Sequence, residues 1–532
     1  MPGENALPEL EKHWHALARV LFGKEVGELG GFEPYLRKYL EPVDVRKSAI
    51  SGKEVVYSKE DYCEDAKAIG FDEIDFRKKF SALSINDVKD IDSLFEAAGE
   101  RAVYAGSIIR GNSKFVGKST TVNDSYFVYG CSDIESSKYV AHSCVIRDSD
   151  TVFGCNTGGM GNYLLHCNGF INLTRCFEVW VGSASSDCFY SHNIDNCHEC
   201  IFCFNLRSRR FCIGNLEIER SKFLALKGKL LLEIADRLQK EKSAPSLVEL
   251  TVGCKDHSRQ VGEALKGKIG KEAREKQDKG SVEEAFRRAS GIIFGKPLVG
   301  MDRHGEWLLR HNKQMRRDIS IISGREVLCG DYGARFFLPQ NRFIADSEME
   351  VFGENIRIGE EEAEGINLGG AAALLGKVAY FNPSILSGQN RNVIECASTI
   401  DANSCYRCVS VGQSEKCAYS FVPRQSQYLF GCNWVIRSSF CIKCYDSAKI
   451  TRCFEVDNAT SCSDSYFCHD VENVHNSMFC FNVKNLNYAI GNCEVGREKF
   501  LEVKSALQKW MLGKLEKEGG LEMDIFNVGC KK

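Results

Sequence analysis

The residues best placed to bind a metal are three cysteines in the string NCHECIFCF. Cys197, Cys200 and Cys203 stand at C-x-x-C-x-x-C spacing, and closely spaced thiolates are ligands for zinc and for iron–sulfur clusters. Two other interpretations compete with a metal site. The thiols are free and pack as small apolar side chains, or some of them pair as disulfides.

A second set of residues has the chemistry for acid–base work or for partner contacts. A guanidinium, a carboxylate and an imidazole on one face are the components of acid–base catalysis. The interpretation that we favour is a ladder of ion pairs on the surface, and a partner-contact surface is the third. The residues are Arg147, Arg175, Glu178, Asp187, His192, Arg424, Arg452, Glu455, Asp464 and His469.

The strings that carry these residues occur twice in the chain. TRCFEV is found at 174–179 and 451–456, and FGCN at 153–156 and 430–433, both with an offset of 277. Upstream, SGKEV at 51 and SGREV at 323 are offset by 272. Matches at a nearly constant offset predict a tandem duplication.

Each copy is predicted to have a mixed α/β front section with a hairpin near Ser51–Glu54, a β-rich middle section and a closing amphipathic helix. The fold class is therefore mainly β with α. The predicted divisions are 1–123 (front section 1), 124–216 (middle section 1), 217–256 (helix and tail 1), 257–283 (charged helical spacer), 284–400 (front section 2), 401–493 (middle section 2) and 494–532 (helix and tail 2).

The middle sections repeat every twelve residues. Steps of twelve from Cys131 give Ser143, Cys155 and Cys167, and steps from Val128 give Val140 and Val152. Small or apolar columns, with Asn, Asp, Ser and Gly between short β-prone runs, predict a parallel β-solenoid with about eight repeats in each copy. A full turn has either twelve residues or about twenty-four, and an ion pair between Arg175 and Asp187 would select twelve.

The middle sections resemble the right-handed parallel β-helix proteins, the group that includes pectate-lyase-like enzymes and tubulin-cofactor-C-like domains. They are most similar to cysteine-rich solenoid proteins of microbial genomes, whose last turn reads like FCFNLRSRRFCIGN (202–215) and runs into a helix. The resemblance concerns architecture, so it implies a fold and assigns no catalytic residue.

The twelve-residue repeat helps to decide whether the three closely spaced cysteines bind a metal. Cys200 and Cys203 belong to the two predicted inward columns, whereas Cys197 lies outside them. At the matched positions, the second copy has Val474 and Ser477 in place of Cys197 and Cys200. We therefore expect buried, unmetallated thiols and no cofactor.

The closing helices, 217–240 and 494–515, are expected to cap the solenoids. An open last turn exposes unpaired backbone groups and an apolar cross-section. Phe223 and Phe500, followed by Leu224 and Leu501, are the side chains expected to plug the two ends.

Composition excludes several functional classes. The net charge of −3 gives no general attraction to nucleic acid, and no stretch of about 20 apolar residues is present to span a membrane. No charged-then-apolar leader opens the chain, and 26 cysteines without such a leader favour a reducing cytoplasm.

We expect a non-enzymatic structural or interaction protein that bridges macromolecular partners, most simply proteins, with self-assembly as one form. The first alternative is an RNA- or ribosome-associated factor, based on the basic strings NLRSRR (205–210) and LLRHNKQMRR (308–317). The second is a carbohydrate-active enzyme of the β-helix type, by analogy of fold alone.

Overall fold

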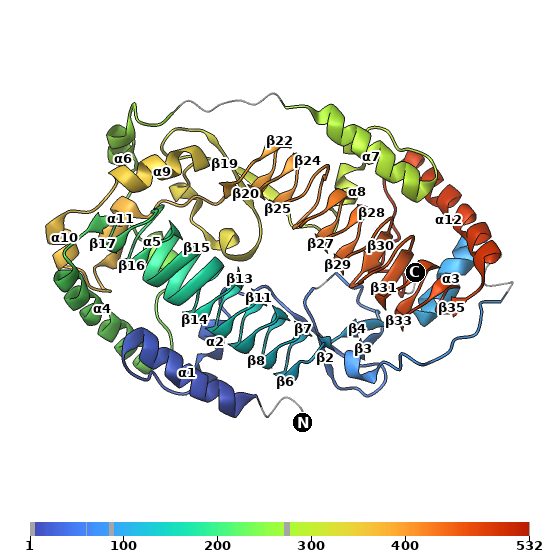
Figure 1. Cartoon of the computed structure of the whole chain (residues 1–532), viewed down its shortest axis with the longest axis horizontal. Coiled ribbons are helices and arrows are strands. Elements are labelled where there is room, and N and C mark those ends of the chain that lie inside the picture. Colours follow the sequence, from blue (N-terminus) through green and yellow to red (C-terminus); the bar gives the residue numbers. More distant parts are fainter. Residues whose placement is uncertain (1–5, 60, 85–89, 271–276, 531–532) are drawn as a thin grey trace.

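Two stacks of short parallel strands lie at the centre of the molecule. The structure is a computed structural model that describes residues 6–59, 61–84, 90–270 and 277–530. We name the stacks coil 1 (109–217) and coil 2 (386–494), and Figure 1 shows them side by side, each with helices along its outer flank. The molecule is thus a mixed α/β protein with large parallel sheets.

Each coil has a solenoid-like arrangement with a register of twelve residues. In coil 1 Lys138 pairs with Asp150 and Val140 with Val152, in parallel. Coil 2 has the same step, for example from His475 to Asn487. The parallel strands pair across a step of twelve residues, or of thirteen at Ile109 and Leu386, where the coils begin. The alternative turn of about twenty-four residues is therefore excluded for these strands.

The backbone turns a corner at every third residue. Phe127, Asp133, Ser136 and Tyr139 all have φ between 48° and 55°, and Gly130 has φ of 64°. This left-handed region suits Gly, Asn and Asp, which explains why these residue types are frequent along the coils. A turn of twelve residues therefore has four short sides.

One residue from each side points into the coil and is buried. The interior of coil 1 contains Val128, Cys131, Ile134 and Val140, all at most 2% exposed. Residues next to these columns point outward instead and lie beneath the flanking helices, as Phe153 and its neighbours do in coil 1.

Inward thiols and hydroxyls hydrogen-bond to the backbone of the neighbouring turn. The amide of Cys131 donates to Ser119 Oγ at 3.0 Å, and the amide of Ser143 donates to Cys131 Sγ at 3.4 Å. The next turns continue with Ser143 Oγ and Cys155 Sγ as acceptors. At these positions cysteine has the same role as serine, because it accepts a hydrogen bond from the backbone of the neighbouring turn. It also packs as a small apolar side chain.

Helices cover the outer flank of each coil. Helix α1 (Leu7–Phe22) has Pro8 in its first turn and ends at Gly23, whose φ of 79° fits a left-handed C-cap. Its buried side chains, among them Trp14, share a hydrophobic core with coil 1 and with α4 (Arg220–Glu241). Helices α7 (Lys279–Phe294) and α12 (Arg497–Glu518) cover coil 2 in the same way.

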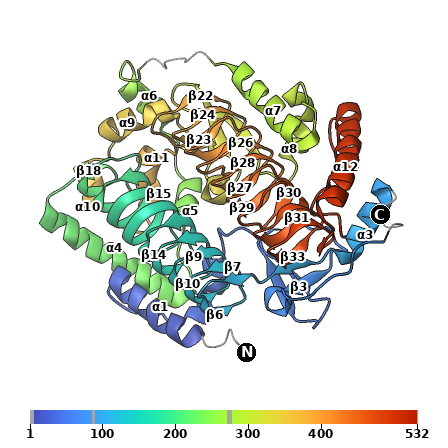
Figure 2. The same ribbon diagram turned by 45° about the vertical axis from the view of Figure 1, so that its right-hand side comes forward.

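Two segments cross over and pack on the opposite coil. We name the described residues of 44–107 arm 1 and residues 315–382 arm 2. Arm 1 shares the core of coil 2, and arm 2 shares the core of coil 1. Figures 1 and 2 show α3 (Ile91–Arg101), in arm 1, beside α12, and α9 (Asp346–Asn355), in arm 2, beside coil 1.

Matched hydrogen bonds hold the arms in place. Asn205 of coil 1 donates from Nδ2 to Tyr380 O at 2.9 Å. At the position 277 residues later, Asn482 of coil 2 donates from Nδ2 to Val103 O at 2.7 Å. Each coil therefore binds the arm that belongs to the other half of the chain.

The closing helices plug the coil ends only through their first turn. Phe223 and Phe500 are fully buried, next to Phe211 and Tyr488 respectively. Leu224 and Leu501 are 43% and 44% exposed, so the expectation that they also plug the ends is wrong.

The remaining cover of the coil ends comes from the arms. Asn215 at the end of coil 1 donates to Ile356 O of arm 2, and Arg101 of arm 1 donates to Gly491 O of coil 2. The repeat pattern alone predicted this role for the helices, because the exchange of the arms depends on contacts between distant parts of the chain.

One cysteine pair departs from the expectation of free thiols. Cys63 of arm 1 and Cys530 near the C-terminus form a disulfide, with Cα atoms 6.5 Å apart. Within front section 1, α3 begins at Ile91, and residues 85–89 lie outside the described part. The predicted helical spacer contains α6 (Ser258–Leu265) and the start of α7, and its residues 271–276 also lie outside the described part.

The strands of coil 1 are β5 (Ile109–Arg110), β6 (Lys114–Gly117), β7 (Thr120–Asn123), β8 (Tyr126–Tyr129), β9 (Ser132–Glu135), β10 (Lys138–Ala141), β11 (Cys144–Arg147), β12 (Asp150–Phe153), β13 (Asn156–Gly159), β14 (Asn162–Leu165), β15 (Asn168–Asp195), β16 (His198–Ile201), β17 (Arg210–Ile213) and β18 (Leu216–Glu217). Those of coil 2 are β21 (Leu386–Ser387), β22 (Arg391–Ile394), β23 (Ala397–Ile400), β24 (Asn403–Tyr406), β25 (Val409–Gly412), β26 (Gln427–Phe430), β27 (Asn433–Ile436), β28 (Ser439–Ile442), β29 (Tyr445–Ala448), β30 (Phe454–Asp457), β31 (Tyr466–Glu472), β32 (His475–Met478), β33 (Phe481–Lys484), β34 (Asn487–Ile490) and β35 (Cys493–Glu494).

The arms contain β1 (Asp44–Lys47), β2 (Glu54–Tyr57), β3 (Ala68–Gly70) and β4 (Tyr104–Gly106), then β19 (Met315–Ile319) and β20 (Glu326–Gly330). The other helices are α2 (Glu33–Leu36), α5 (Leu247–Val252), α8 (Gly305–Leu309), α10 (Glu360–Glu364) and α11 (Ala371–Val378). The hairpin predicted near residue 51 is confirmed by the antiparallel pairing of β1 with β2.

Among the described helices, none combines the length and the apolar character needed to cross a bilayer.

Candidate functional site

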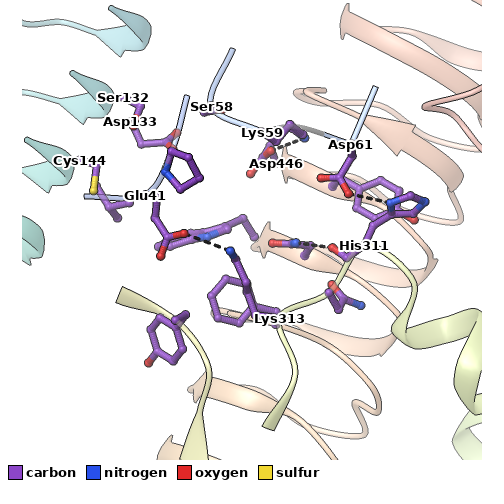
Figure 3. A pocket seen from close by; sticks show the side chains of 18 of the residues that line it. Glu41, Ser58, Lys59, Asp61, Ser132, Asp133, Cys144, His311, Lys313 and Asp446 are labelled. Atoms are coloured by element: carbon purple, nitrogen blue, oxygen red, sulfur yellow. Dashed lines mark hydrogen bonds and ion pairs between the residues drawn. The ribbon is translucent and has the colours of Figure 1, made fainter. Parts of the chain in front are cut away.

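A polar cavity of about 370 Å³ lies where the two coils and the crossing segments meet. Figure 3 shows Ser132, Asp133 and Cys144 of coil 1 on one side and Asp446 of coil 2 on the other. The segments that lead into the arms supply further side chains between the coils. We call this site the central cavity.

An ion pair spans the place where the two segments cross. Lys313 Nζ lies 3.0 Å from Glu41 Oε2, and the Gly333 amide donates to Glu41 Oε1 at 2.9 Å. Residues 41 and 313 are separated by 272, the offset of the upstream repeats, so matched positions of the two halves contact each other here. The two halves differ in charge at this position, which makes the contact attractive.

A buried lysine joins the cavity to the interior of the second half. Lys59 Nζ lies 2.5 Å from Asp446 and 2.6 Å from Asp457. Burial disfavours the charged form of Lys59, but these two carboxylates outweigh it and raise the lysine pKa. Tyr62 and His469 also hydrogen-bond to Asp457, each at 2.8 Å, so Asp457 is fully partnered.

His311 forms a second charged group in the cavity wall. Its Nδ1 lies 2.8 Å from Asp61, and its Nε2 lies 2.9 Å from Asp524. Burial favours the neutral ring, but Asp524 and Asp61 outweigh this effect and raise the pKa of His311. The two carboxylates therefore favour the protonated form of the imidazole that lies between them.

Asp133 differs from the other charged groups because its carboxylate has no partner. No hydrogen bond or ion pair within the described residues involves it, although its side chain lines the cavity. Burial and the nearby Asp446 raise the pKa of Asp133 to about 7, while Arg147 and Lys59 oppose the rise. This carboxyl group therefore exchanges a proton near neutral pH.

The outer walls carry the ion pairs that the repeat predicted. Arg175 contacts Asp187 through two hydrogen bonds of 2.8 and 2.6 Å. Arg452 and Asp464 repeat this geometry with the same two distances. These predicted pairings are confirmed, and the guanidinium groups remain exposed to solvent, with side-chain exposures of 45% and 43%.

Four of the proposed surface residues are buried: Glu178, His192, Glu455 and His469. Glu178 accepts hydrogen bonds from Leu247 N at 2.8 Å and Trp180 Nε1 at 3.0 Å, and Glu455 accepts one from Ile525 N at 3.0 Å. The ladder interpretation is therefore wrong for these positions. The Glu178 and Glu455 side chains anchor the tail that follows each coil.

The buried glutamates have matched basic residues as neighbours. His166 lies 3.0 Å from Glu178, and Lys443 lies 3.8 Å from Glu455. Burial raises the pKa of Glu455 to about 8, with Lys443 opposing the rise. These contacts lie inside the assembly of coil and tail.

The two histidine positions have different surroundings. His469 bonds Asp457 through Nδ1 and accepts from the Ala105 amide at 2.9 Å through Nε2. Neither ring nitrogen of His192 has a hydrogen-bond partner, and burial lowers its pKa to about 3. Each ring lies beside the phenylalanine one turn on, Phe204 or Phe481.

Arg147 and Arg424 also occupy matched positions with different contacts. Arg147 lies over the ring of Trp434, 5.5 Å from its centroid, and 3.3 Å from Glu135. Arg424 donates to Ser410 O, and burial lowers its pKa. Neither guanidinium is part of the matched exposed pairs on the outer walls.

Cys197, Cys200 and Cys203 are all buried inside coil 1 as free thiols. Cys197 is inward as well, and its amide donates to Ser185 Oγ at 3.0 Å, so the expectation that it falls outside the pattern is wrong. The coil has four inward columns where the sequence analysis recognised two. Within the described ranges, no group of three or more His, Cys, Asp or Glu side chains is arranged to hold a metal ion.

The basic strings that suggested RNA contacts make several internal contacts. Arg207 donates to Asn193 O at 2.7 Å, and Arg310 donates to Leu521 O at 2.8 Å. Arg317 lies 2.6 Å from Glu326 and 2.7 Å from Glu395. These cations hold the fold together.

Sequence reasoning missed the central cavity and its charged residues. Lys59, Asp133 and Asp446 have no matched counterparts of the same type in the other half, so the search for repeated polar residues passed over them. The opposite charges of Glu41 and Lys313, at matched positions, are the signal in the sequence that points to a contact between the halves. A comparison of the chain with protein families, with curated proteins and with solved structures finds no match.

Proposed function

We propose that this chain is a non-enzymatic interaction protein that presents two similar solenoid walls to macromolecular partners. The observation that carries the proposal is the exchange of arms 1 and 2 between the coils. Because each arm packs on the opposite coil, the two walls have a fixed mutual orientation. A fixed pair of similar surfaces suits a component that bridges or assembles other molecules.

We further propose that the two halves arose by tandem duplication, with about eight repeats in each solenoid. Support comes from contacts that recur at matched positions. Asn156 donates to Tyr39 O and Asn433 donates to His311 O, both at 2.8 Å. A duplicated chain with exchanged arms corresponds to two subunits joined into one polypeptide.

The matched exposed ion pairs are the surfaces that we assign to partner contact. Arg175 with Asp187 on coil 1 and Arg452 with Asp464 on coil 2 present the same planar guanidinium next to a carboxylate. An exposed ion pair adds little to stability, so substitution there can affect binding without unfolding the protein. A protein partner is the simplest occupant, and a second copy of this chain is one such partner.

Proximity labelling in the source cell tests this proposal. We would compare the wild-type chain with a variant that changes Arg175, Asp187, Arg452 and Asp464 to Ala. The matched control changes Lys138 and Asp150, an exposed ion pair of 2.9 Å one turn apart that has no counterpart on coil 2.

We expect the four-residue variant to lose neighbours that the wild type and the control share. An unchanged set of labelled neighbours would contradict the assignment. RNA that copurifies and is released by salt would favour the RNA- or ribosome-associated alternative, and depolymerisation of an acidic polysaccharide would favour the carbohydrate-active one.

A further inference from the structure

The central cavity contains a carboxylate that no protein group contacts directly. Asp133 has no hydrogen-bond or ion-pair partner within the described residues, and its carboxylate faces the space between the coils (Figure 3). The cationic side chains in and beside the wall are held by other carboxylates: Lys59 by Asp446 and Asp457, His311 by Asp61 and Asp524, Lys313 by Glu41, and Arg147 by Glu135. Acidic groups therefore outnumber basic ones, and a cation is attracted to the site.

The wall also has an extensive aromatic surface. Aromatic rings provide apolar contact for a carbon chain. The rings that line the cavity are Tyr332, Phe421, Trp434, Tyr445 and Phe526. This surface favours an organic cation over a hydrated metal ion, and the cavity volume of about 370 Å³ is within the usual range for small-molecule sites.

We propose that the central cavity binds a small alkylamine, with an ammonium group at Asp133 and its carbon chain against the aromatic wall. Ligand binding thereby connects coil 1 to coil 2 at the point where the arms cross. This inference is independent of the partner-contact surfaces on the outer walls.

Calorimetric titration of the full-length protein with putrescine tests the site. We expect one saturable site in low-salt buffer at pH 8 and no binding of 1,4-butanediol, which has the same length but no charge. Asp133→Asn should weaken binding at least tenfold, because it removes the negative charge.

The matched control is Asp148→Asn. Asp148 is also a corner residue of coil 1, with φ of 48° against 55° for Asp133, but it lies on the exposed outer wall. Asn accepts this conformation, so both variants should fold, as circular dichroism and thermal melting would verify. Absence of putrescine binding by the wild type, or equal binding by the two Asn variants, would overturn the proposal.

The pH dependence gives a second readout. The ammonium group binds the ionised form of Asp133, whose pKa is about 7 in the presence of Asp446, Arg147 and Lys59. Affinity should therefore be about tenfold lower at pH 6 than at pH 8, with a proton released on binding below pH 7. A pH profile that is the same in the wild type and in Asp133→Asn would contradict the role of Asp133.

Discussion

At the scale of single residues, the coils use small side chains that combine burial with hydrogen bonding. Serine and cysteine alternate at the inward positions, where each accepts a bond from the backbone of the next turn, as Ser119 and Cys131 do. This role explains why cysteines are so frequent without a metal site being required. The thiol is small enough for a narrow coil and still satisfies a buried amide.

The buried thiols should react slowly in the native protein. Burial raises the pKa of Cys131 to about 12 and that of Cys462 to about 11, so little thiolate exists at pH 8. In a titration with a thiol reagent followed by mass spectrometry, the partly exposed Cys254 and Cys493 should be modified first. Rapid modification of Cys131 or Cys203 in folded protein would show that the coil interior is accessible.

His192 should make the protein sensitive to mild acid. Burial lowers its pKa to about 3, so between pH 6.5 and pH 3 the unfolded chain binds a proton that the folded state does not. The stabilisation is complete above pH 6.5 and is lost as the pH falls, by about 2 kcal/mol at pH 5. His192→Phe should reduce the difference between the melting temperatures at pH 7 and pH 5.

The matched variant His469→Phe provides a contrast. It breaks the hydrogen bonds to Asp457 and to the Ala105 amide, so it should lower the melting temperature at both pH values. If His192→Phe keeps the full wild-type decline on acidification, His192 is not the group responsible.

At the scale of elements, regular corners of the backbone define the coils, and the closing helices pack against the last turn of each coil. A corner at every third residue brings the strand of one turn beside the strand of the next, with a register of twelve. The closing helices then contact the last turn through Phe223 and Phe500, which are buried beside Phe211 and Tyr488. This burial sets the expected effects of substitution.

Phe223→Ala should destabilise the protein by about 3–5 kcal/mol, because Phe223 is fully buried beneath the end of coil 1. Its neighbour Leu224 is 43% exposed, so Leu224→Ala should change the free energy of unfolding by less than about 0.5 kcal/mol. Urea denaturation of the two variants measures the difference. Similar losses for both would mean that the helix packs in another way.

At the scale of the whole molecule, exchanged arms join the two halves. Arm 1 packs on coil 2 and arm 2 on coil 1, and the crossing segments meet at the ion pair between Glu41 and Lys313. Covalent continuity between Gly270 and Gln277 is then not needed to keep the halves together. The disulfide between Cys63 and Cys530 adds a covalent link between the same halves.

A protease site introduced between Gly270 and Gln277 tests this organisation. After cleavage of the folded chain under reducing conditions, the two fragments should elute together in gel filtration and separate only in denaturant. The reductant is necessary because the disulfide would otherwise hold the fragments together. Separation of the fragments in native reducing buffer would show that the arm contacts are too weak to join the halves.

The sequence by itself determined the features that depend on local repetition. The step of twelve residues, the buried position of columns such as the one through Cys155 and Cys167, and the pairing of Arg175 with Asp187 all follow from spacing along one solenoid. Stacking places residues one turn apart next to each other, so sequence separation directly encodes contact. The hairpin near residue 51 follows in the same way from its turn residues.

The tertiary structure decided everything that depends on contacts between the halves. The exchange of the arms, the burial of Glu178 and His192, and the central cavity bring together residues from distant parts of the chain, such as Lys59 and Asp457. Such contacts are not periodic in the sequence. They depend on which hydrophobic surface each arm covers, and both coils offer similar surfaces, so only the folded chain shows that each arm packs on the opposite coil.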